Sequence, residues 1–275
     1  MIAVAAVAGL ATLQDGGRPG HMHEGVPPGG PLVPELFARA NAAARNAQDQ
    51  AAIELMGRMT LEARRRTVIA TDAGDAWSLD EGETCTLAGE GARVRYIAVR
   101  GGFDVPVVLG GRGTLLVAGL GGHEGRPLRR GDILRAGDSP MAAARRDLPP
   151  PPDREAPLRI VPGPDTDRFE ARDLVVLLSS TFVVDARSDR VGIRLTGASR
   201  LTRPSADVGG SSPMVRGAIQ VPPSGELIVL GPDHPTTGGY PVVATVARAC
   251  LGSLGARPLG AAVRFVTFAN PASAG

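Results

Sequence analysis

The residues best suited to chemistry lie in one stretch of the chain, Gly217–Pro241, where polar side chains accompany two apolar runs. Asp233, Thr237 and Tyr240 stand on a loop after the second run, and Gln220 lies in the first. Loops held by rigid strands often carry catalytic and binding residues. A carboxylate can accept or position a proton, and glutamine and tyrosine can hydrogen-bond a substrate amide. The pattern predicts Asp233, Gln220 and Tyr240 as catalytic residues and Thr237 as a substrate-binding residue.

Turns that combine glycines with an arginine recur at 100–102, 110–114 and 121–126. Glycines allow backbone N–H groups to converge on an anion, and arginine binds carboxylate or phosphate through two hydrogen bonds. The same sequences also fit simple β-turns that need a positive φ, so both interpretations stay open. Under the first, we expect Arg112 and Arg126 to hold a substrate carboxylate or a developing anion.

The polar turn 14–20 offers a third arginine, Arg18, which we also expect to bind substrate. The alternative is an Asx-type turn with Arg18 exposed or paired with Asp15. A strand-like segment, 188–195, carries alternating polar side chains that share one face. Asp189 and Arg194 are expected to orient a ligand there, although a salt-bridge network that includes Arg190 is the commoner outcome for such a segment.

Two other constellations carry weaker signals. His21, His23 and Glu24 resemble a metal pair, but no third histidine is near and a turn-rich loop is a poor platform, so we expect no metal. Asp233 and His234, with the serines at 211 and 212, could suggest a hydrolytic triad. The chain has no nucleophile-elbow sequence to support it.

The chain of 275 residues contains no lysine, so all 30 of its basic residues are arginine. A Walker-type phosphate loop and a Schiff-base lysine are therefore excluded. Covalent biotin is excluded as well, because biotin is attached to a lysine side chain. We expect no covalently bound cofactor.

Charge and hydropathy narrow the class further. The formal charge is +2 with no basic stripe, so we expect no nucleic acid, and 64–66 and 145–146 fit solvated surface. No apolar run is long enough to span a bilayer, and the apolar segment 2–13 lacks the basic start of a signal peptide. Two distant cysteines, Cys85 and Cys250, favour reduced thiols and a cytoplasmic location.

The elements that must position these residues are mostly short strands. Pro34–Arg45 predicts a helix with proline at its first position, and Ala51–Met56 predicts a short helix or its continuation. Dense turn signals between short apolar runs are typical of barrels and sandwiches. We expect strands at 68–71, 84–87, 94–99, 106–109, 115–117, 133–134, 158–161, 174–178, 182–184, 192–195, 218–221, 227–230, 242–246 and 263–268.

A run of four prolines within Asp147–Pro157 predicts the domain boundary, because such a segment is stiff and cannot join a central strand. We therefore expect an N-terminal domain of residues 1–148 and a C-terminal domain of residues 157–275. Both are expected to be mainly β.

Taken in order, these motifs match one family along nearly the whole chain. The match is carried by Gln14-Asp15-x-Gly17-Arg18-x-Gly20, Gly25-Val26-Pro27, Ala40-Asn41, Ile53-Glu54, Ala98-Val99-x-Gly101-Gly102-Phe103-Asp104-Val105-Pro106, Leu109-Gly110-x-Arg112-x-Thr114, Leu120-Gly121-Gly122, Gly125-Arg126, Gly131-Asp132, Ser188-Asp189-Arg190-x-Gly192-x-Arg194-Leu195, Gly217–Pro223 and Thr236-Thr237-Gly238-Gly239-Tyr240-Pro241. The chain resembles the family of 5-oxoprolinase C-type subunits, also described as the biotin-dependent carboxyltransferase-like or allophanate hydrolase subunit 2 family.

The resemblance implies two carboxyltransferase-like subdomains that form cyclophilin-like β-barrels with few short helices. It implies a B-type partner and a separate A-type component, with which the assembly opens 5-oxoproline, a lactam, to glutamate at the expense of ATP. ATP is then used by the assembled complex. Two alternatives stay open: a non-catalytic regulatory or binding protein on the same fold, and a carboxyltransferase that uses biotin carried by another chain.

The chain departs from the family pattern at positions where relatives carry polar side chains. These positions are Gly29, Val33, Gly111, Pro213 and Pro235. Each change removes a hydrogen-bond donor or acceptor. We therefore expect a component with weakened or altered activity, and the alternative of neutral drift at non-essential surface positions stays open.

Overall fold

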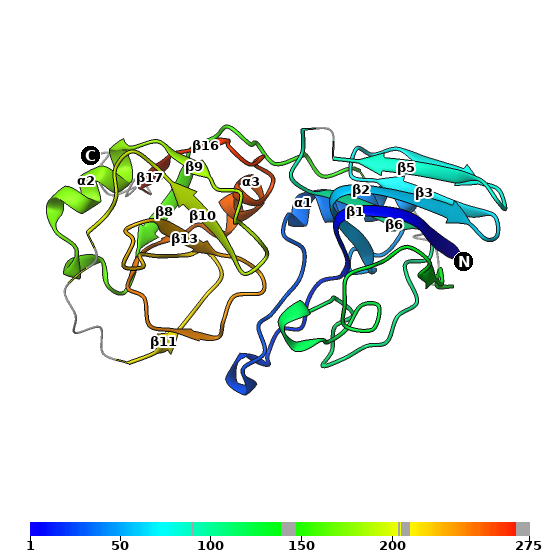
Figure 1. The fold of residues 1–275 in the computed structure, drawn as a ribbon, viewed down its shortest axis with the longest axis horizontal. Coiled ribbons are helices and arrows are strands. Elements are labelled where there is room, and N and C mark those ends of the chain that lie inside the picture. Colours follow the sequence, from blue (N-terminus) through cyan, green and yellow to red (C-terminus); the bar gives the residue numbers. More distant parts are fainter. Residues whose placement is uncertain (90, 139–146, 203, 205–209, 268–275) are drawn as a thin grey trace. The chain divides into compact units, whose positions relative to one another are not determined.

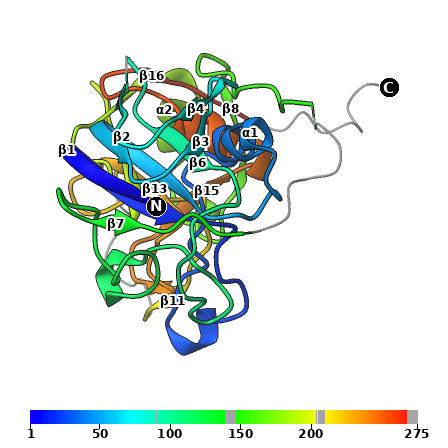
Figure 2. The ribbon, with the colours of Figure 1, turned by 90° about the vertical axis from the view of Figure 1, so that its right-hand side faces the viewer.

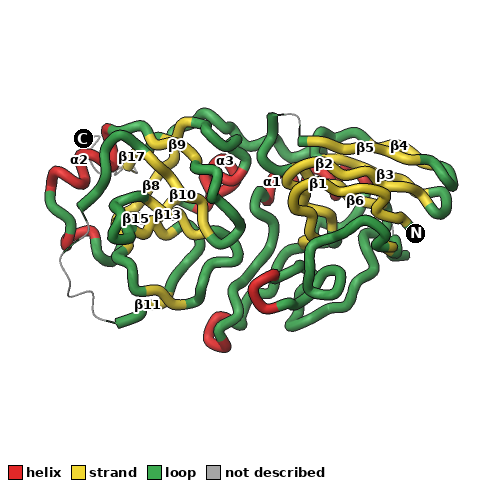
Figure 3. Tube along the Cα trace, viewed as in Figure 1, coloured by secondary structure: helices red, strands yellow, loops and turns green. Residues whose placement is uncertain are grey.

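The computed structural model describes residues 1–89, 91–138, 147–202, 204 and 210–267. The chain is mainly β, with a nearly closed, barrel-like sheet and three short α-helices in the described residues, which confirms the expected fold class (Figures 1 and 3). Two compact units make up the chain: Met1–His21 with Pro28–Pro152, and Met22–Pro27 with Asp153–Gly275. The sequence did not indicate that Met22–Pro27 groups with the second unit.

The first unit is built on a seven-stranded sheet in the order β4-β3-β6-β2-β1-β7, with β5 also paired to β2. Two long antiparallel strands form its centre, and β2 pairs with β6 through its first half and β5 through its second. The strands are β1 (Ile2–Gln14), β2 (Ala52–Ala63), β3 (Thr67–Thr71), β4 (Ala76–Leu79), β5 (Thr84–Ala88), β6 (Arg95–Val99) and β7 (Ile133–Leu134).

Gly9 and Gly57 lie opposite each other in the β1–β2 ladder and make the close approach of the two strands possible. Their φ angles are +106° and +131°, which side chains rarely allow. A Cβ on Gly9 would lie 2.2 Å from the carbonyl oxygen of Met56. Glycine at such a point is typical of a tight bend at a barrel corner.

The core of the first unit lies between the sheet and the segments that cover it. Buried members include Leu13, Ile53, Leu55, Leu61 and Ile97. The helix α1 (Pro34–Ala44) packs on β3 and β6 (Figure 2), where the Phe37 and Tyr96 rings meet edge to face at 5.9 Å.

The second unit holds an eight-stranded sheet in the order β16-β9-β10-β13-β12-β15-β8-β17, in which the described pair of β17 and β8 is parallel, and a separate β11–β14 ribbon. Its core includes Phe182 and Phe265, whose rings lie 5.8 Å apart. The strands are β8 (Leu158–Pro162), β9 (Phe182–Val184), β10 (Gly192–Thr196), β11 (Ser212–Pro213), β12 (Ala218–Gln220), β13 (Leu227–Leu230), β14 (Thr237–Gly238), β15 (Val242–Val246), β16 (Ala262–Val263) and β17 (Phe265–Thr267).

The remaining helices are short. The second unit contains α2 (Ala171–Ser179) and α3 (Leu251–Gly255), and 3-10 turns lie at Met22–Glu24, Leu116–Ala118, Thr166–Arg168 and Arg248–Cys250. No helix in the part of the chain that the structure describes is long and apolar enough to cross a membrane.

Four element predictions are wrong. Residues 51–56 belong to β2 because strands on both sides pair with them, and 174–178 lie in α2, whose Leu174, Leu177 and Leu178 recur at helical spacing. Residues 106–109 form a loop with a single bridge from Val108 to Gly111, and 115–117 lie largely in a 3-10 turn. The expected helix 34–45 and the other expected strands are present, except that 263–268 is divided between β16, which ends at Val263, and β17 (Phe265–Thr267). Phe268, the last residue of the expected final strand, lies outside the described residues.

Candidate functional site

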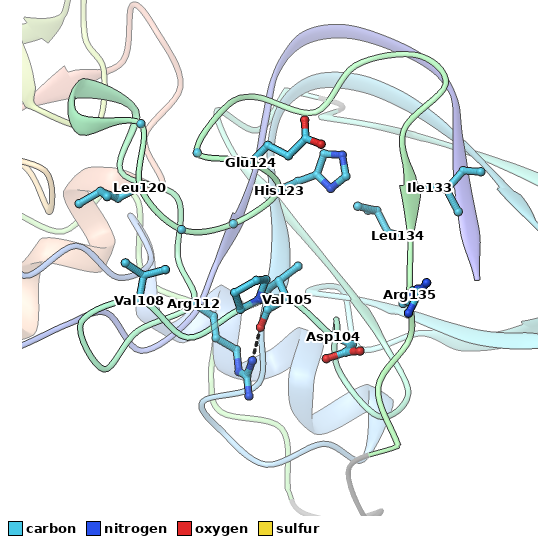
Figure 4. A pocket seen from close by; sticks show the side chains of 15 residues that line it. Asp104, Val105, Val108, Arg112, Leu120, His123, Glu124, Ile133, Leu134 and Arg135 are labelled. Carbon is cyan, nitrogen blue, oxygen red and sulfur yellow. Dashed lines mark hydrogen bonds between the residues drawn. The ribbon is translucent and has the colours of Figure 1, made fainter.

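A cleft of about 750 Å³ lies beside β7 in the first unit. Figure 4 shows Arg112 and Asp104 on one side of it and His123 and Glu124 on the loop opposite. Arg135, directly after β7, completes its polar lining, and Val105, Val108, Leu120, Ile133 and Leu134 supply apolar surface. An apolar cleft with a few convergent polar groups is the usual form of a small-molecule site.

Asp15, at the end of β1, fixes the segment that presents Arg112. Its Oδ1 accepts hydrogen bonds from the backbone N–H groups of Gly17 (2.9 Å) and Gly113 (3.0 Å). Its Oδ2 accepts one from the N–H of Arg112 at 2.5 Å. A buried carboxylate that serves three backbone donors holds the two loops together, so the role of Asp15 is structural.

The loop 119–125 forms one wall of the cleft because its glycines permit very close packing. Gly125 has φ +68°, and a Cβ there would lie 1.9 Å from the carbonyl oxygen of Gly119. A Cβ on Gly122 would lie 1.9 Å from Oγ1 of Thr114, which itself donates to the Leu13 carbonyl at 3.0 Å. Only glycine fits at these two positions.

Arg112 is the predicted site residue that faces the cleft. One guanidinium nitrogen, Nη1, donates to the carbonyl oxygen of Val105 (Figure 4). Among the described residues the guanidinium makes no ion pair. It also lines a second, polar cavity of about 260 Å³ together with Asp104 and Gln50. A half-buried guanidinium with donors to spare is suited to a carboxylate ligand.

Arg18 is neither the exposed arginine of an Asx-type turn nor part of the cleft lining. It is 2% exposed and donates to the carbonyl oxygens of Val108 (3.4 Å) and Gly113 (2.5 Å). Arg18 therefore braces the loop that carries Arg112.

Arg126 also lies behind the cleft. Its Nη1 and Nη2 donate to the two carboxylate oxygens of Asp132 at 2.8 and 2.9 Å, and its Nε donates to Glu124 at 3.0 Å. The hydrogen bonds from Arg126 hold the pKa of Asp132 below its ordinary value, and the charge of the nearby His123 adds to this. Arg126 thus orients the loop through Asp132.

The glycine turns do not form anion-binding nests. Their backbone N–H groups mostly donate within the protein, those of Gly101, Gly102, Gly111, Gly113, Gly122 and Gly125 among them. The β-turn interpretation accounts for these glycines. The arginines beside these turns have different roles: Arg112 lines the cleft, and Arg126 pairs with Asp132.

In the second unit, Asp233 is paired with Arg190. Nε of Arg190 donates to Oδ2 of Asp233 at 2.7 Å, Nη2 donates to Oδ1 at 2.8 Å, and the two side chains are 3% and 5% exposed. Both carboxylate oxygens are therefore engaged. The salt-bridge interpretation of this segment applies to Arg190, which was not predicted as a site residue.

Gln220 lies beside the β11–β14 ribbon, to which Thr237 belongs. Gln220 is 5% exposed and its amide donates to the sulfur of Met214 at 3.3 Å. Thr237 pairs with Pro213, and a Cβ on Gly238 would lie 2.8 Å from the Gln220 amide nitrogen. Tyr240 follows on the surface, 42% exposed.

Asp189 lies in the turn before β10, and Arg194 lies within β10. Oδ1 of Asp189 accepts the backbone N–H groups of Val191 and Gly192, each at 2.9 Å, which closes the turn. Arg194 pairs with Ile228 of β13 in the sheet register and is half-buried.

Other polar residues of the cleft were not predicted as site residues. Asp104, His123 and Glu124 lie in or beside the glycine-rich motifs, but a single sequence could not show which motif members face a cavity. His234, which the sequence offered only as a member of a hydrolytic triad, is fully buried, and its Nε2 has no hydrogen-bond partner in the described structure. Burial lowers the pKa of His234 below its ordinary value.

Metal and thiol chemistry find little support in these residues. No group of three or more His, Cys, Asp or Glu side chains among the described residues is arranged to hold a metal. Both cysteines are free, and burial raises the pKa of Cys85 to about 11. A thiol of that pKa is a poor nucleophile near neutral pH.

Comparison with known proteins places this geometry in a family. The chain is 33% identical to the C subunit of 5-oxoprolinase from Escherichia coli (93% of this chain, 87% of that protein) and 30% identical to that of Haemophilus influenzae (96% and 90%). It matches the structure of Kluyveromyces lactis urea carboxylase with a TM-score of 0.84 and 26% identity, over 98% of this chain and 27% of that one. Because the model of the carboxyltransferase domain, subdomain A and B, matches residues 24–267, the chain belongs to that family.

Proposed function

We propose that this chain is the C-type component of an ATP-dependent 5-oxoprolinase, which opens 5-oxoproline to glutamate together with homologues of the B-type and A-type components. The observation that carries this proposal is the extent of the match. The chain covers 87% and 90% of two 5-oxoprolinase C subunits but 27% of the urea carboxylase. The cytoplasmic location expected from the free cysteines is part of the same proposal.

The cleft beside β7 is the proposed binding site in the first unit. Arg112 would hold the carboxylate of 5-oxoproline, because its guanidinium has donors that no carboxylate of the described structure uses. Asp104 and Glu124 would accept hydrogen bonds from the lactam N–H. Ring opening adds one water across the lactam C–N bond, which yields the amine and second carboxylate of glutamate.

Gln220, Thr237 and Tyr240 remain proposed substrate contacts in the second unit. Tyr240 and Thr237 are exposed and could reach a ligand directly. Asp189, Arg194 and Asp233 would position that segment, since Asp233 holds Arg190 and Asp189 closes the turn before β10. Proton transfer by Asp233 would require release of Arg190.

The direct test is reconstitution with the A-type and B-type homologues from the same genome. We expect copurification with the B-type homologue and ATP hydrolysis that depends on 5-oxoproline. Arg112→Gln should lower this activity by a factor of about 10² or more, as loss of one charged contact to a reacting substrate does, while Arg129→Gln, an exposed arginine outside the cleft, should not. Equal activity of the Arg112→Gln and wild-type complexes would contradict the site assignment.

The likeness to urea carboxylase favours one second candidate, transfer of a carboxyl group from biotin carried by another chain. Since this chain has no lysine, the biotin must come from a partner. Loss of turnover on addition of avidin would support the carboxyltransferase, and avidin-insensitive turnover of 5-oxoproline would exclude it. Copurification without turnover of either substrate would indicate the regulatory alternative.

A further inference from the structure

A further cavity of the first unit, separate from the two described above, has a volume of about 480 Å³. Its lining includes three arginines, Arg65, Arg66 and Arg100, and the hydroxyl-bearing Ser78. We propose that it binds a phosphate-bearing small molecule, through a cluster of guanidinium groups on the outer face of β3, β4 and β6. The proposal does not depend on the function proposed above, because neither Arg112 nor any other residue of the cleft lines this cavity.

The strand register brings Ser78 and Arg100 to one face, and Arg65 and Arg66, which directly precede β3, line the same cavity. Val68 of β3 lies opposite Ser78 of β4, and the backbone N–H of Arg100 donates to the Val68 carbonyl at 3.0 Å. Paired residues of neighbouring strands point to the same side of a sheet, and so do residues two apart along one strand. Val68, Ser78 and Arg100 therefore share a face, whereas Ile69 is buried in the core on the other.

The positive charge of this face is poorly neutralised. Arg66 pairs with Asp80 at 3.5 Å, but the two side chains are 77% and 72% exposed, and pairs of this kind contribute little. Arg100 donates through Nε to the carbonyl oxygen of Ala44, the last residue of α1, at 3.5 Å. Arg65 has no hydrogen bond or ion pair through its guanidinium in the described residues.

These features favour phosphate over a carboxylate ligand. One guanidinium group can donate two parallel hydrogen bonds to two phosphate oxygens. A phosphate dianion or a diphosphate can bind several guanidinium groups at once, whereas a single carboxylate offers one charge. Neutral hydroxyls such as that of Ser78 can donate to a remaining phosphate oxygen. The volume exceeds that of a phosphate ion and falls in the range of pockets that hold whole small molecules.

The test measures binding of inorganic pyrophosphate, AMP and inorganic phosphate to the full chain by isothermal titration calorimetry at constant ionic strength. We expect wild-type protein to bind pyrophosphate. Arg65→Gln and Arg100→Gln should each weaken the affinity about tenfold or more, the usual effect of removing one charged hydrogen bond. Arg58→Gln removes the same charge from an exposed position on β2 outside the cavity and should leave binding unchanged.

Ser78→Asp provides a second variant, since an exposed aspartate at this position should block the anion without disturbing the core. Its fold is checked by circular dichroism. Tighter binding of AMP than of phosphate would identify a nucleotide-like ligand, and the reverse a free phosphate or diphosphate. Absence of pyrophosphate binding at about 10 mM, a limit above usual ligand affinities, would overturn the proposal, as would equal binding by the double variant Arg65→Gln/Arg100→Gln. Selective binding of a polyglutamate peptide instead would also overturn it.

Discussion

The buried pair of Arg190 and Asp233 gives the sharpest test of how the second unit works. Asp233→Asn keeps the shape of the side chain but removes the carboxylate that accepts two hydrogen bonds from the buried guanidinium of Arg190. Because both side chains are at most 5% exposed and are joined by hydrogen bonds of 2.7 and 2.8 Å, we expect a loss of about 3–5 kcal/mol in the free energy of unfolding. Arg190→Met should cost a similar amount, because it leaves a buried carboxylate.

The double variant Arg190→Met/Asp233→Leu removes both charges and should lie within about 1–2 kcal/mol of wild type, since apolar replacement of a whole buried pair is often neutral. Urea unfolding followed by far-UV circular dichroism measures all four proteins. Trp77, the single tryptophan of the chain, lies in the first unit and reports on that unit separately by fluorescence. Additive effects of the two single variants would refute the structural role. An Asp233→Asn protein of wild-type stability without turnover would instead support proton transfer by Asp233.

Three further outcomes follow from single contacts. Burial lowers the folded-state pKa of His234 below 6.5, so the unfolded chain binds more protons below that pH. Stability should then fall on acidification by at most about 1.4 kcal/mol per pH unit, and His234→Gln should flatten this slope in urea titrations at several pH values. Val33 is the N-cap residue of α1 and provides no side-chain cap. The isosteric Val33→Thr should therefore add about 1 kcal/mol to the free energy of unfolding, or about 2–4 °C to Tm. An unchanged or lower Tm would contradict this expectation. Gly125→Ala should lower the free energy of unfolding by at least about 3 kcal/mol, because its Cβ would lie 1.9 Å from a backbone oxygen. Gly119 has a similar φ but open space around it, so Gly119→Ala should lower that free energy by about 1 kcal/mol. Equal losses of the two variants in urea unfolding would count against this packing argument.

Local sequence signals predicted the elements that short-range physics determines. Pro34 at the first helical position and the run of alanines suffice for α1, and the valine-rich run after Pro241 suffices for β15. The predictions for residues 51–56 and 174–178 were wrong for opposite reasons. Two neighbouring strands recruit 52–55 into β2, whereas the leucines of α2 pack at helical spacing although their valine neighbours favour strand.

The sequence alone does not separate a ligand-binding side chain from a structural one when the same chemical group serves both roles. Arginine suits a ligand carboxylate and a buried carbonyl equally, so nothing local separates Arg112, which lines the cleft, from Arg18, which braces the loop behind it. Asp233 and Arg190 lie 43 positions apart, and their pairing depends on the turn before β10 meeting the loop after β13. Such pairings are long-range contacts that spacing in the sequence does not encode.

The backbone also sorts the departures from the family pattern by whether a polar side chain would fit. At Gly111 a Cβ would lie 2.8 Å from the carbonyl oxygen of Gly17, and Gly29 has a φ of +64°, so restored side chains there would strain the loops. Pro235 is exposed, and Val33 stands where a helix cap belongs. Backbone strain therefore does not oppose a reversion at Val33 or at Pro235, although Val33 is buried.

The double reversion Val33→Asp/Pro235→Gln tests whether the departures weaken activity. An aspartate can cap α1, although the carboxylate introduced at position 33 would approach the buried Glu54 through the Tyr96 hydroxyl, which Val33 and Glu54 share as hydrogen-bond partners. If the lost polar groups served the reaction, the double variant should raise turnover of 5-oxoproline in the reconstituted complex, because a contact to the transition state is commonly worth about a hundredfold in rate. Wild-type turnover equal to that of a motif-complete C-type homologue would instead show that the departures are neutral.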